Sequence, residues 1–289
     1  MDHFTAEDGA RLAFRDEGAG LPVLALAGLT RDGRDFDYMA RHLPAVRLIR
    51  LDSRGRGGSD WTGAASYNVG QEVRDALALL DHLGVARAAV IGSSRGGLLG
   101  MVMGATQRAR VAGLLFNDVG PQIERAGLER IGTYIGIAPT VPTLDEIADR
   151  SAAQFPGFHH VPATRWAEET VRHYVQTATG VALTYDPALK IAFDVAMAAP
   201  PVDLWPLFDA LAGLPLGLVR GANSDVLSRD GADAMRARRP DMHFAEVPDR
   251  GHIPFLDEPE ALACIRAFLD QVALAENAAP PLGGRSVTL

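Results

Sequence analysis

Residues 86–97 read ARAAVIGSSRGG, and this stretch decides the fold. The short apolar run at its start, residues 86–92, is typical of a strand buried in a parallel sheet. Residues 98–106 then favour a helix, so the glycine-rich segment between them must form a sharp strand-to-helix turn. The turn has the pattern G-x-S-x-G with Ser94 at its centre. Such a turn exposes the serine hydroxyl at the carboxyl end of the sheet, where it can act as a nucleophile.

The sizes of the neighbouring residues select Ser94 over Ser93. A nucleophile in this turn needs small residues two positions before and after it, and Ser94 has Gly92 and Gly96 there. The equivalent neighbours of Ser93 are bulky. The backbone amide of Arg95 begins the predicted helix and is expected to stabilise an oxyanion beside Ser94.

A second oxyanion donor is expected from the loop after the apolar run 22–28. The backbone amide of Leu29 is the best candidate in that loop. Because a backbone group plays this role, the side chain at position 29 is little constrained.

Serine is a weak nucleophile without a base, and we expect the base to be a histidine later in the chain. His252 follows the last apolar run, where a loop returns to the carboxyl edge of the sheet. The other histidines lie at the N-terminus, in predicted covering helices, at a strand start or in a long insertion. A zinc site formed by His159, His160 and His173 lacks acidic or cysteine partners at metal spacing. The sequence therefore predicts His252 as the base.

The base needs a carboxylate that fixes its tautomer, and two aspartates compete for this role. Asp225 follows the penultimate strand in the turn GANSD and precedes His252, so chain order favours it. Asp118 lies at the end of the strand that follows the predicted helix 98–106, where a carboxylate can also reach the base. We predict Asp225 as the acid and keep Asp118 as its rival.

Short apolar runs alternate with helical patterns along most of the chain. This alternation predicts a doubly wound α/β fold with a mostly parallel sheet. One helical pattern places Val73, Leu77, Leu80 and Leu83 on a single buried face. The predicted strands are residues 22–28, 46–52, 86–92, 111–118, 215–221 and 242–248.

One interruption divides the core. Residues 122–203 lack strand-like runs and concentrate aromatic residues, so we interpret them as an inserted helical lid. The core then comprises residues 1–121 and 204–277. Residues 278–289 are predicted to be a flexible tail.

Composition limits the possible partners. Of 289 residues, 28 are basic and 36 acidic, and a net charge of −8 argues against nucleic-acid or anionic-membrane binding. The single cysteine cannot form an internal disulfide. The N-terminus lacks a signal-peptide pattern, so we expect a cytoplasmic protein. A homodimer is left open.

Two glycine motifs suggest nucleotide binding but do not complete the required patterns. The dinucleotide fingerprint counted from Gly55 needs glycine at position 60, which is aspartate. The segment 92–97 resembles a P-loop, but Leu98 occupies the position of its lysine. We therefore expect no cofactor and no metal.

With the G-x-S-x-G turn, the acid and the histidine in this order, the chain resembles the α/β-hydrolase fold superfamily over nearly its whole length. The carrying motifs are GSSRGG at 92–97, DSRGRGGSD at 52–60, GANSD at 221–225 and RGHIPFLDEPE at 250–260. The second motif resembles a turn in lid-bearing members. Two departures are Ala27-Gly28, where His-Gly is usual, and Arg95 directly after the nucleophile.

The resemblance implies a lid-bearing serine esterase or lactonase that cleaves a carboxylic ester or lactone through an acyl-enzyme. Arg31, Tyr134 and Trp166 are the candidate substrate-binding residues. Arg95 either recognises a substrate carboxylate or pairs with an acid from the lid or a loop, and the pairing is favoured. A C–C bond hydrolase of dienoate ring-cleavage products is the nearest alternative, and a non-catalytic small-molecule receptor is the alternative from another class.

Overall fold

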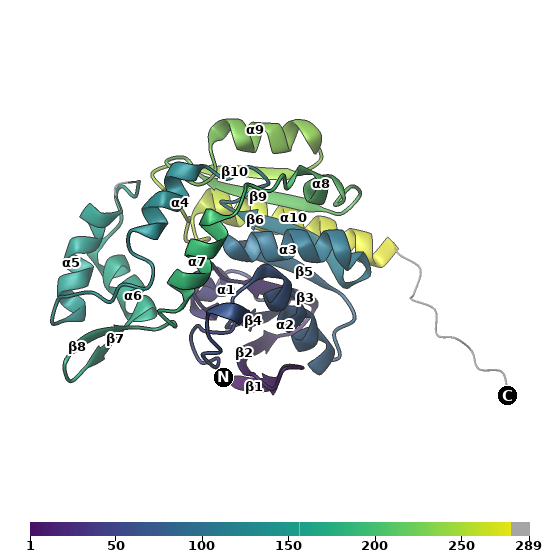
Figure 1. Ribbon diagram of the computed structural model, residues 1–289. Helices are drawn as coiled ribbons and strands as arrows, with labels where there is room; N and C mark the ends of the chain where they lie inside the picture. The colour runs from purple at the N-terminus through teal and green to yellow at the C-terminus, as the bar shows by residue number, and fades with distance from the viewer. Residues whose placement is uncertain (156, 279–289) are drawn as a thin grey trace.

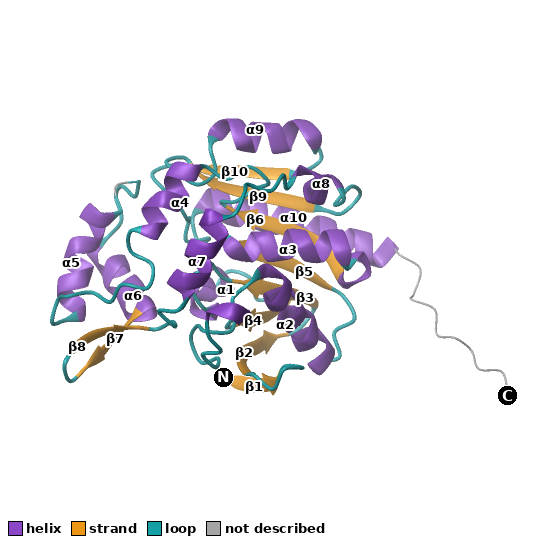
Figure 2. Cartoon of the chain, viewed as in Figure 1, coloured by secondary structure: helices purple, strands orange, loops and turns teal. Residues whose placement is uncertain are grey.

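An eight-stranded sheet forms the centre of the computed structural model, which describes residues 1–155 and 157–278 (Figure 2). Its strand order is β1-β2-β4-β3-β5-β6-β9-β10. β1 and β2 are antiparallel to their neighbours, whereas the other pairs are parallel. The strands are β1 (Asp2–Thr5), β2 (Arg11–Gly18), β3 (Leu21–Leu26), β4 (Val46–Leu51), β5 (Ala88–Ser93), β6 (Val111–Asn117), β9 (Leu216–Gly221) and β10 (His243–Val247).

Helices cover both faces of this sheet (Figure 1). One layer contains α2 (Val69–His82), α3 (Arg95–Thr106), α8 (Trp205–Asp209) and α9 (Arg229–Arg238). The other contains α1 (Asp37–Ala40) and α10 (Pro259–Ala278). Short 3₁₀ turns at Gly33–Phe36, Ala64–Ser66 and Arg108–Arg110 join these elements. The helices and the parallel strands together form the predicted α/β fold.

Alternating side chains of the central strands divide the core into two apolar layers. Along β5, Val90 packs into the layer under α2 and α3, whereas Ala89 and Ile91 pack into the layer under α10. β3 alternates in the same way, with Leu24 on the first side and Val23 on the second. Burial on both faces explains why these strands appear in the sequence as continuous apolar runs.

Residues 122–203 lie between β6 and α8 and form a segment with its own elements. We call them the inserted segment. It contains the helices α4 (Arg125–Gly132), α5 (Leu144–Gln154), α6 (Ala163–His173) and α7 (Leu189–Ala198). It also contains a small antiparallel hairpin, β7 (Tyr174–Thr177) and β8 (Gly180–Leu183), where no strand was predicted. In Figure 1, α5, α6 and the hairpin project to one side of the sheet.

The strands at the antiparallel edge were also not predicted. β2 places Leu12 and Phe14 in the core but exposes charged residues toward its end. The predicted tail lies outside the described residues, except for Ala278 at the end of α10. Among the described helices, none combines the length and the apolar character needed to span a bilayer.

Candidate active site

Ser94 lies at the tip of the turn between β5 and α3. Its backbone has φ 49° and ψ −116°, which is a strained conformation for a residue with a side chain. Its amide donates to Asn117 O over 2.9 Å, so the turn is tied to the end of β6. Strain held in this way by surrounding structure is typical of functional positions.

The glycines around Ser94 are required by close backbone contacts. A Cβ on Gly96 would lie 1.9 Å from Leu26 O, and one on Gly92 would lie 2.4 Å from the carbonyl carbon of Gly96. Both distances are far below van der Waals contact. The structure thus explains the predicted need for small residues on each side of Ser94.

His252 and Asp118 continue from Ser94 in a chain of hydrogen bonds. Ser94 Oγ lies 2.8 Å from His252 Nε2, the contact that the sequence predicted. On the other side of the ring, Nδ1 lies 2.7 Å from Asp118 Oδ2. A nucleophile, a base and an orienting acid therefore occur in the arrangement needed for serine catalysis.

Asp118 is fully buried, and its carboxylate accepts two further hydrogen bonds. Gly221 N donates to Oδ1 over 2.9 Å, and Ser224 Oγ donates to Oδ2 over 2.6 Å. These two donors fix the orientation of the carboxylate. The carboxylate is consequently held in place to orient the His252 ring.

The prediction that Asp225 orients His252 is wrong, because the carboxylate that contacts the ring is that of Asp118, while Asp225 bonds a different partner. Its carboxylate pairs with Arg130 of α4, including a 2.8 Å bond to Nη2, and about a third of the side chain is exposed. Both aspartates follow strands that end at the same edge of the sheet. β6 adjoins β5, however, so Asp118 reaches the histidine that contacts Ser94.

Within the described residues, the two backbone amides predicted to form the oxyanion hole, those of Leu29 and Arg95, have no protein acceptor. Arg95 is the first residue of α3, so its N–H has no acceptor one turn back in the helix. In the part of the chain that the structure describes, Leu29 N donates to no protein group. Gly28, which precedes it, lies against Ser94: a Cβ built there would be 3.8 Å from Ser94 Cβ.

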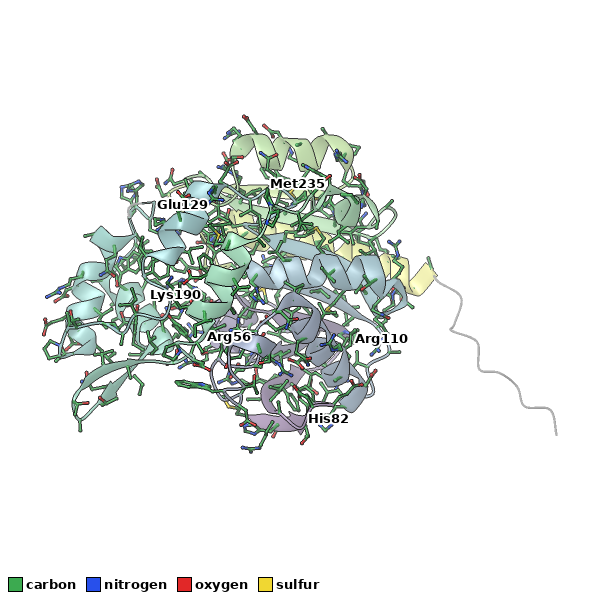
Figure 3. All side chains as sticks on the ribbon, in the orientation of Figure 1. Arg56, His82, Arg110, Glu129, Lys190 and Met235 are labelled. Carbon is green, nitrogen blue, oxygen red and sulfur yellow. The ribbon has the colours of Figure 1, made fainter. Side chains whose placement is uncertain are left out.

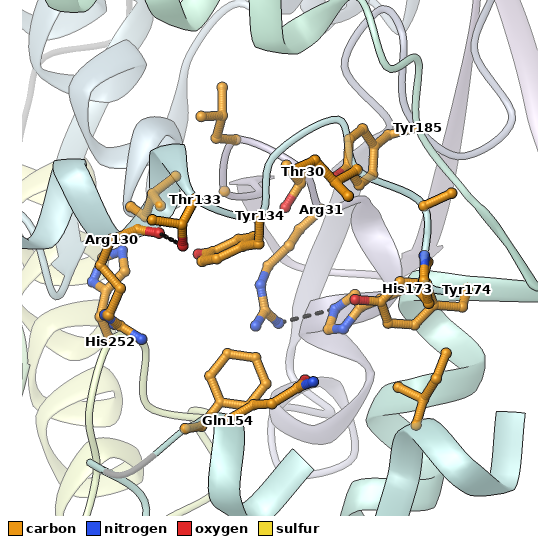
Figure 4. Close-up of a pocket in the computed structure, with 18 of the residues that line it drawn as sticks. Thr30, Arg31, Arg130, Thr133, Tyr134, Gln154, His173, Tyr174, Tyr185 and His252 are labelled. Atoms are coloured by element: carbon orange, nitrogen blue, oxygen red, sulfur yellow. Dashed lines mark hydrogen bonds between the residues drawn. The ribbon is translucent and has the colours of Figure 1, made fainter. Parts of the chain in front are cut away.

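A cavity of about 510 Å³ opens above Ser94 and His252 (Figure 4). This volume is in the range of small-molecule sites. The inserted segment supplies most of the apolar wall. Its contributions include Ile131, Tyr134, Ile137, Val141, Ile147, Phe155, Tyr174 and Tyr185. Burial raises the pKa of the Tyr185 phenol to about 12, so this group stays neutral at physiological pH.

Arg31 points into this cavity from the loop after β3 (Figure 4). Its Nη1 contacts Asp35 Oδ2 at 3.1 Å, Glu169 Oε2 at 3.3 Å and His173 Nε2 at 3.0 Å. Burial lowers the pKa of the guanidinium, but Asp35 and Glu169 outweigh that effect and raise it. Arg31 is therefore a fixed cation in the wall, already paired with carboxylates.

Arg130 and Arg150 also line the cavity, and each pairs with an acid, Asp225 and Glu146 respectively.

Arg95 does not line the cavity. The Arg95 guanidinium forms a two-bond pair with Glu72 of α2, at 2.8 and 2.9 Å. The structure thus agrees with the favoured pairing of Arg95, although the acid comes from a core helix rather than from the lid or a loop.

Of the predicted substrate-binding residues, Arg31 and Tyr134 line the main cavity and Trp166 does not. Trp166 is buried, and its ring stacks on Phe155 with centroids 5.8 Å apart. It borders a smaller hollow of about 40 Å³ beside the main cavity. Trp166 therefore supports Phe155 at the main cavity, and its contact with substrate stays a prediction.

Sequence reasoning missed several polar residues that shape the site. Ser224 and Asn223 suggested a turn projecting Asp225, yet the Ser224 hydroxyl binds Asp118 instead. The pairs of Arg31 with Glu169 and of Arg130 with Asp225 join distant segments. Glu169 and His173 are four residues apart, which places both on one face of α6. This spacing was the only signal in α6 for the cluster that these two residues form with Arg31 and Asp35.

Comparisons with known proteins find hydrolases among the relatives of the chain. The chain is 37% identical over 272 residues to a 3-hydroxybutyrate-oligomer hydrolase of Cupriavidus necator, covering 89% of this chain and 92% of the relative. It is 29% identical over 146 residues to a 2-hydroxymuconate semialdehyde hydrolase of Pseudomonas putida, about half of each chain (49% and 51%).

Solved structures show the same fold. The crystal structure of an alpha/beta hydrolase from Novosphingobium aromaticivorans matches with a TM-score of 0.87 and 39% identity, covering 93% of this chain and 97% of that one. Residues 23–263 match the profile of the family described as "Alpha/beta hydrolase family". With this match over most of its length, the chain belongs to the alpha/beta hydrolase family.

Proposed function

We propose that the protein is a serine hydrolase that cleaves carboxylic esters through an acyl-enzyme intermediate. The observation that carries the proposal is the hydrogen-bonded chain Ser94–His252–Asp118 at the floor of the 510 Å³ cavity. Nucleophile, base and acid have the contacts that ester cleavage requires, and two backbone amides lie beside them.

In the first half of the reaction, His252 Nε2 takes the proton from Ser94 Oγ as this oxygen attacks the ester carbonyl carbon. The amides of Leu29 and Arg95 stabilise the negative oxygen of the tetrahedral intermediate. Asp118 keeps Nδ1 protonated and stabilises the imidazolium. When the intermediate collapses, His252 gives the proton to the leaving alcohol oxygen, and the acyl group remains on Ser94.

In the second half, water replaces the alcohol. His252 removes a proton from the water, whose oxygen attacks the acyl carbon and forms a second tetrahedral intermediate. The same two amides stabilise it. Collapse releases the carboxylic acid as the proton returns to Ser94 Oγ.

The substrate class that we propose is a short linear oligoester of hydroxy acids. The 37% identical relative is named for 3-hydroxybutyrate oligomers, whose internal linkages are uncharged esters. Each arginine that lines the cavity already pairs with a carboxylate, namely Arg31, Arg130 and Arg150. A wall with compensated charges favours an uncharged reacting group over the anionic dienoate of a C–C hydrolase.

Arg31 is proposed to bind a substrate oxygen. Among the described residues, its hydrogen bonds all leave from Nη1, and the guanidinium points into the cavity (Figure 4). Its remaining N–H groups can therefore donate to an ester or hydroxyl oxygen. We further propose that residues 122–203 act as a lid, since they provide most of the apolar wall above Ser94.

The experiment compares wild-type hydrolysis of p-nitrophenyl butyrate, a 3-hydroxybutyrate dimer and trimer, a lactone and a 2-hydroxydienoate. We expect turnover of the esters, faster on the oligoesters than on the lactone, and no cleavage of the dienoate. Cleavage of the dienoate alone would assign the C–C reaction. Tight binding of these compounds without turnover of any would favour a receptor.

A further inference from the structure

Glu72 is a buried carboxylate in the first turns of α2, and it joins two arginines. It is 1% exposed. Arg95 donates two hydrogen bonds to it, and Arg56 Nη1 donates a third over 3.2 Å. Burial raises the pKa of the carboxyl, but the two arginines outweigh this effect and lower it, so Glu72 is ionised.

Arg56 connects Glu72 to the loop after β3. Its side chain, labelled in Figure 3, is 1% exposed. The Nε donates to Leu29 O over 2.7 Å. Nη1 also donates to Arg54 O over 2.5 Å, which fixes the guanidinium. Arg56 therefore holds the peptide unit that directly follows the Leu29 amide.

Arg95 connects Glu72 to the other oxyanion amide. Its side chain is bound at both Nε and Nη2, and its backbone N–H is one of the two amides beside Ser94. Leu29 and Arg95 come from different β-α turns of the sheet, after β3 and β5. A continuous chain thus runs from Leu29 through Arg56, Glu72 and the Arg95 side chain to the second amide.

We propose that Glu72 is a positioning residue that holds the two halves of the oxyanion hole, the amides of Leu29 and Arg95, in register. This inference rests on the proposed ester hydrolysis and adds a residue to it. Oxyanion stabilisation depends on donors placed within a few tenths of an ångström before the charge develops. Without the Glu72 charge, the buried guanidinium of Arg56 would lose its carboxylate partner and the partly exposed guanidinium of Arg95 would repel it, which would pull on both turns.

The same helix supplies a matched control. Asp75, three residues after Glu72, is equally buried at 1% and also forms a two-bond pair with a buried arginine, Arg54, at 2.6 and 2.7 Å. In the described residues, the Arg54 side chain bonds Asp8 and Asp75 and neither oxyanion turn. Asp75→Asn therefore removes a comparable buried charge whose partner, Arg54, meets the proposed connection only through its backbone carbonyl, which accepts from Arg56 Nη1.

The test compares Glu72→Gln with Asp75→Asn, using p-nitrophenyl butyrate and a short trifluoromethyl ketone. Ser94 Oγ adds to the ketone carbonyl carbon, and the carbonyl oxygen becomes a tetrahedral oxyanion as His252 takes the serine proton. For Glu72→Gln we expect kcat to fall about tenfold to a hundredfold, since complete loss of one donor costs about 10² to 10³. KM should change less than about threefold, and ketone affinity should fall in proportion to kcat. Asp75→Asn should keep kcat and ketone affinity within about threefold.

Unchanged kcat and ketone affinity in Glu72→Gln, or equal losses in Asp75→Asn at a temperature where both are folded, would overturn the inference. If Glu72→Gln does not fold, Arg95→Met takes its place in the same assays, because the Arg95 side chain is partly exposed. The same losses of kcat and ketone affinity are then expected. Failure of the wild type to hydrolyse esters contradicts the proposed function itself. Normal wild-type activity with unaffected variants contradicts only the role of Glu72.

Discussion

At the residue scale, the site depends on which carboxylate can approach the outer nitrogen of His252. The side chain of Asp118 is fully enclosed and bound by a backbone amide and a hydroxyl, whereas the Asp225 side chain is partly exposed and bound to a cation. An enclosed acid keeps one geometry with the ring through the reaction, because its other lone pairs are already satisfied. The acid is thus defined by its environment and not by its order in the chain.

The first prediction concerns the nucleophile. Ser94→Ala should lower kcat by about six orders of magnitude, the loss that removal of the nucleophilic serine causes in the triad of subtilisin. The fold should persist, because the Ser94 hydroxyl contributes no core packing. The measurement is ester turnover with circular dichroism as the folding check, together with mass spectrometry of wild type treated with an organophosphate.

Ser93→Ala is the matched control for that experiment. The Ser93 hydroxyl is buried and accepts a 3.0 Å bond from Asn117 Nδ2, away from His252. The Ser93→Ala variant should therefore retain a kcat within about tenfold of the wild-type value. Organophosphate attached to Ser93 instead of Ser94 would refute the register of the turn.

The second prediction separates the two aspartates. Asp118→Asn should lower kcat by about 10⁴, the loss seen when the equivalent acid of trypsin is replaced by asparagine, because the histidine then adopts the wrong tautomer. Asp225→Asn removes a partner of Arg130 and should change kcat less than about tenfold. A larger loss from Asp225→Asn would return the acid role to that residue. Thermal unfolding of both variants checks that they are folded.

At the element scale, the turn between β5 and α3 depends on the absence of side chains. Gly96 faces the end of β3, and its missing Cβ leaves room for Leu26 O. The helix packs closely on the strands for this reason, and the Arg95 amide consequently lies next to the loop after β3. Strand, turn and helix therefore act as one rigid support for Ser94.

The third prediction tests that support. Gly96→Ala should destabilise the protein by about 3 kcal/mol or more, because the added methyl group overlaps backbone atoms that cannot move independently. Gly70→Ala, in the first turn of α2 with 3.5 Å to its nearest contact, should leave stability unchanged or raise it slightly. Urea unfolding measures both. Equal stability of the two variants would contradict the close-contact argument.

Sequence patterns identified all the strands that are buried on both faces. Five of the six predicted strands, β3, β4, β5, β6 and β9, lie inside the sheet, whereas the sixth, β10, lies at its edge with only Val247 buried. β1 and β2 lie at the antiparallel end of the sheet, and the β7–β8 hairpin lies in the inserted segment. The exposed positions of β1, β2 and β7 carry polar or charged residues or glycine, except for Val175. Such strands pair through backbone bonds that composition does not reveal.

The same distinction holds for the site. The glycines around Ser94 gave a local signal, and His252 followed from chain order. The choice between Asp118 and Asp225 depends on strand adjacency, β6 beside β5, which no single segment encodes. The cluster around Arg31 and the Glu72 connection likewise arise only when distant segments pack together.

At the scale of the whole molecule, charged contacts attach the inserted segment to the core. Arg31 and Asp35 come from the loop and short turn after β3, while Glu169 and His173 come from α6. Arg130 of α4 and Asp225 after β9 form a second attachment on the other side of the cavity. The shape of the substrate cavity therefore depends on ion pairs between the two parts of the chain.

The last prediction uses the acid in the first attachment. Burial alone would raise the pKa of Asp35, but Arg31 and His173 outweigh this effect and lower it from 3.8 to about 2. A lowered pKa in the folded state means that the stabilisation is complete above about pH 5 and decreases as pH falls through 3.8 toward 2. The wild type should thus have a larger free energy of unfolding in urea than Asp35→Asn at pH 6, and the difference between the two free energies should narrow at pH 3.

Asp16→Asn, which removes a partly exposed partner of Arg47 outside this cluster, is the control and should differ little from the wild type in free energy of unfolding at pH 6. A gap between wild type and Asp35→Asn that stays constant from pH 6 to pH 3 would show that the Asp35 carboxylate does not stabilise the junction through its charge. The attachment would then depend on packing of α6 against the loop after β3.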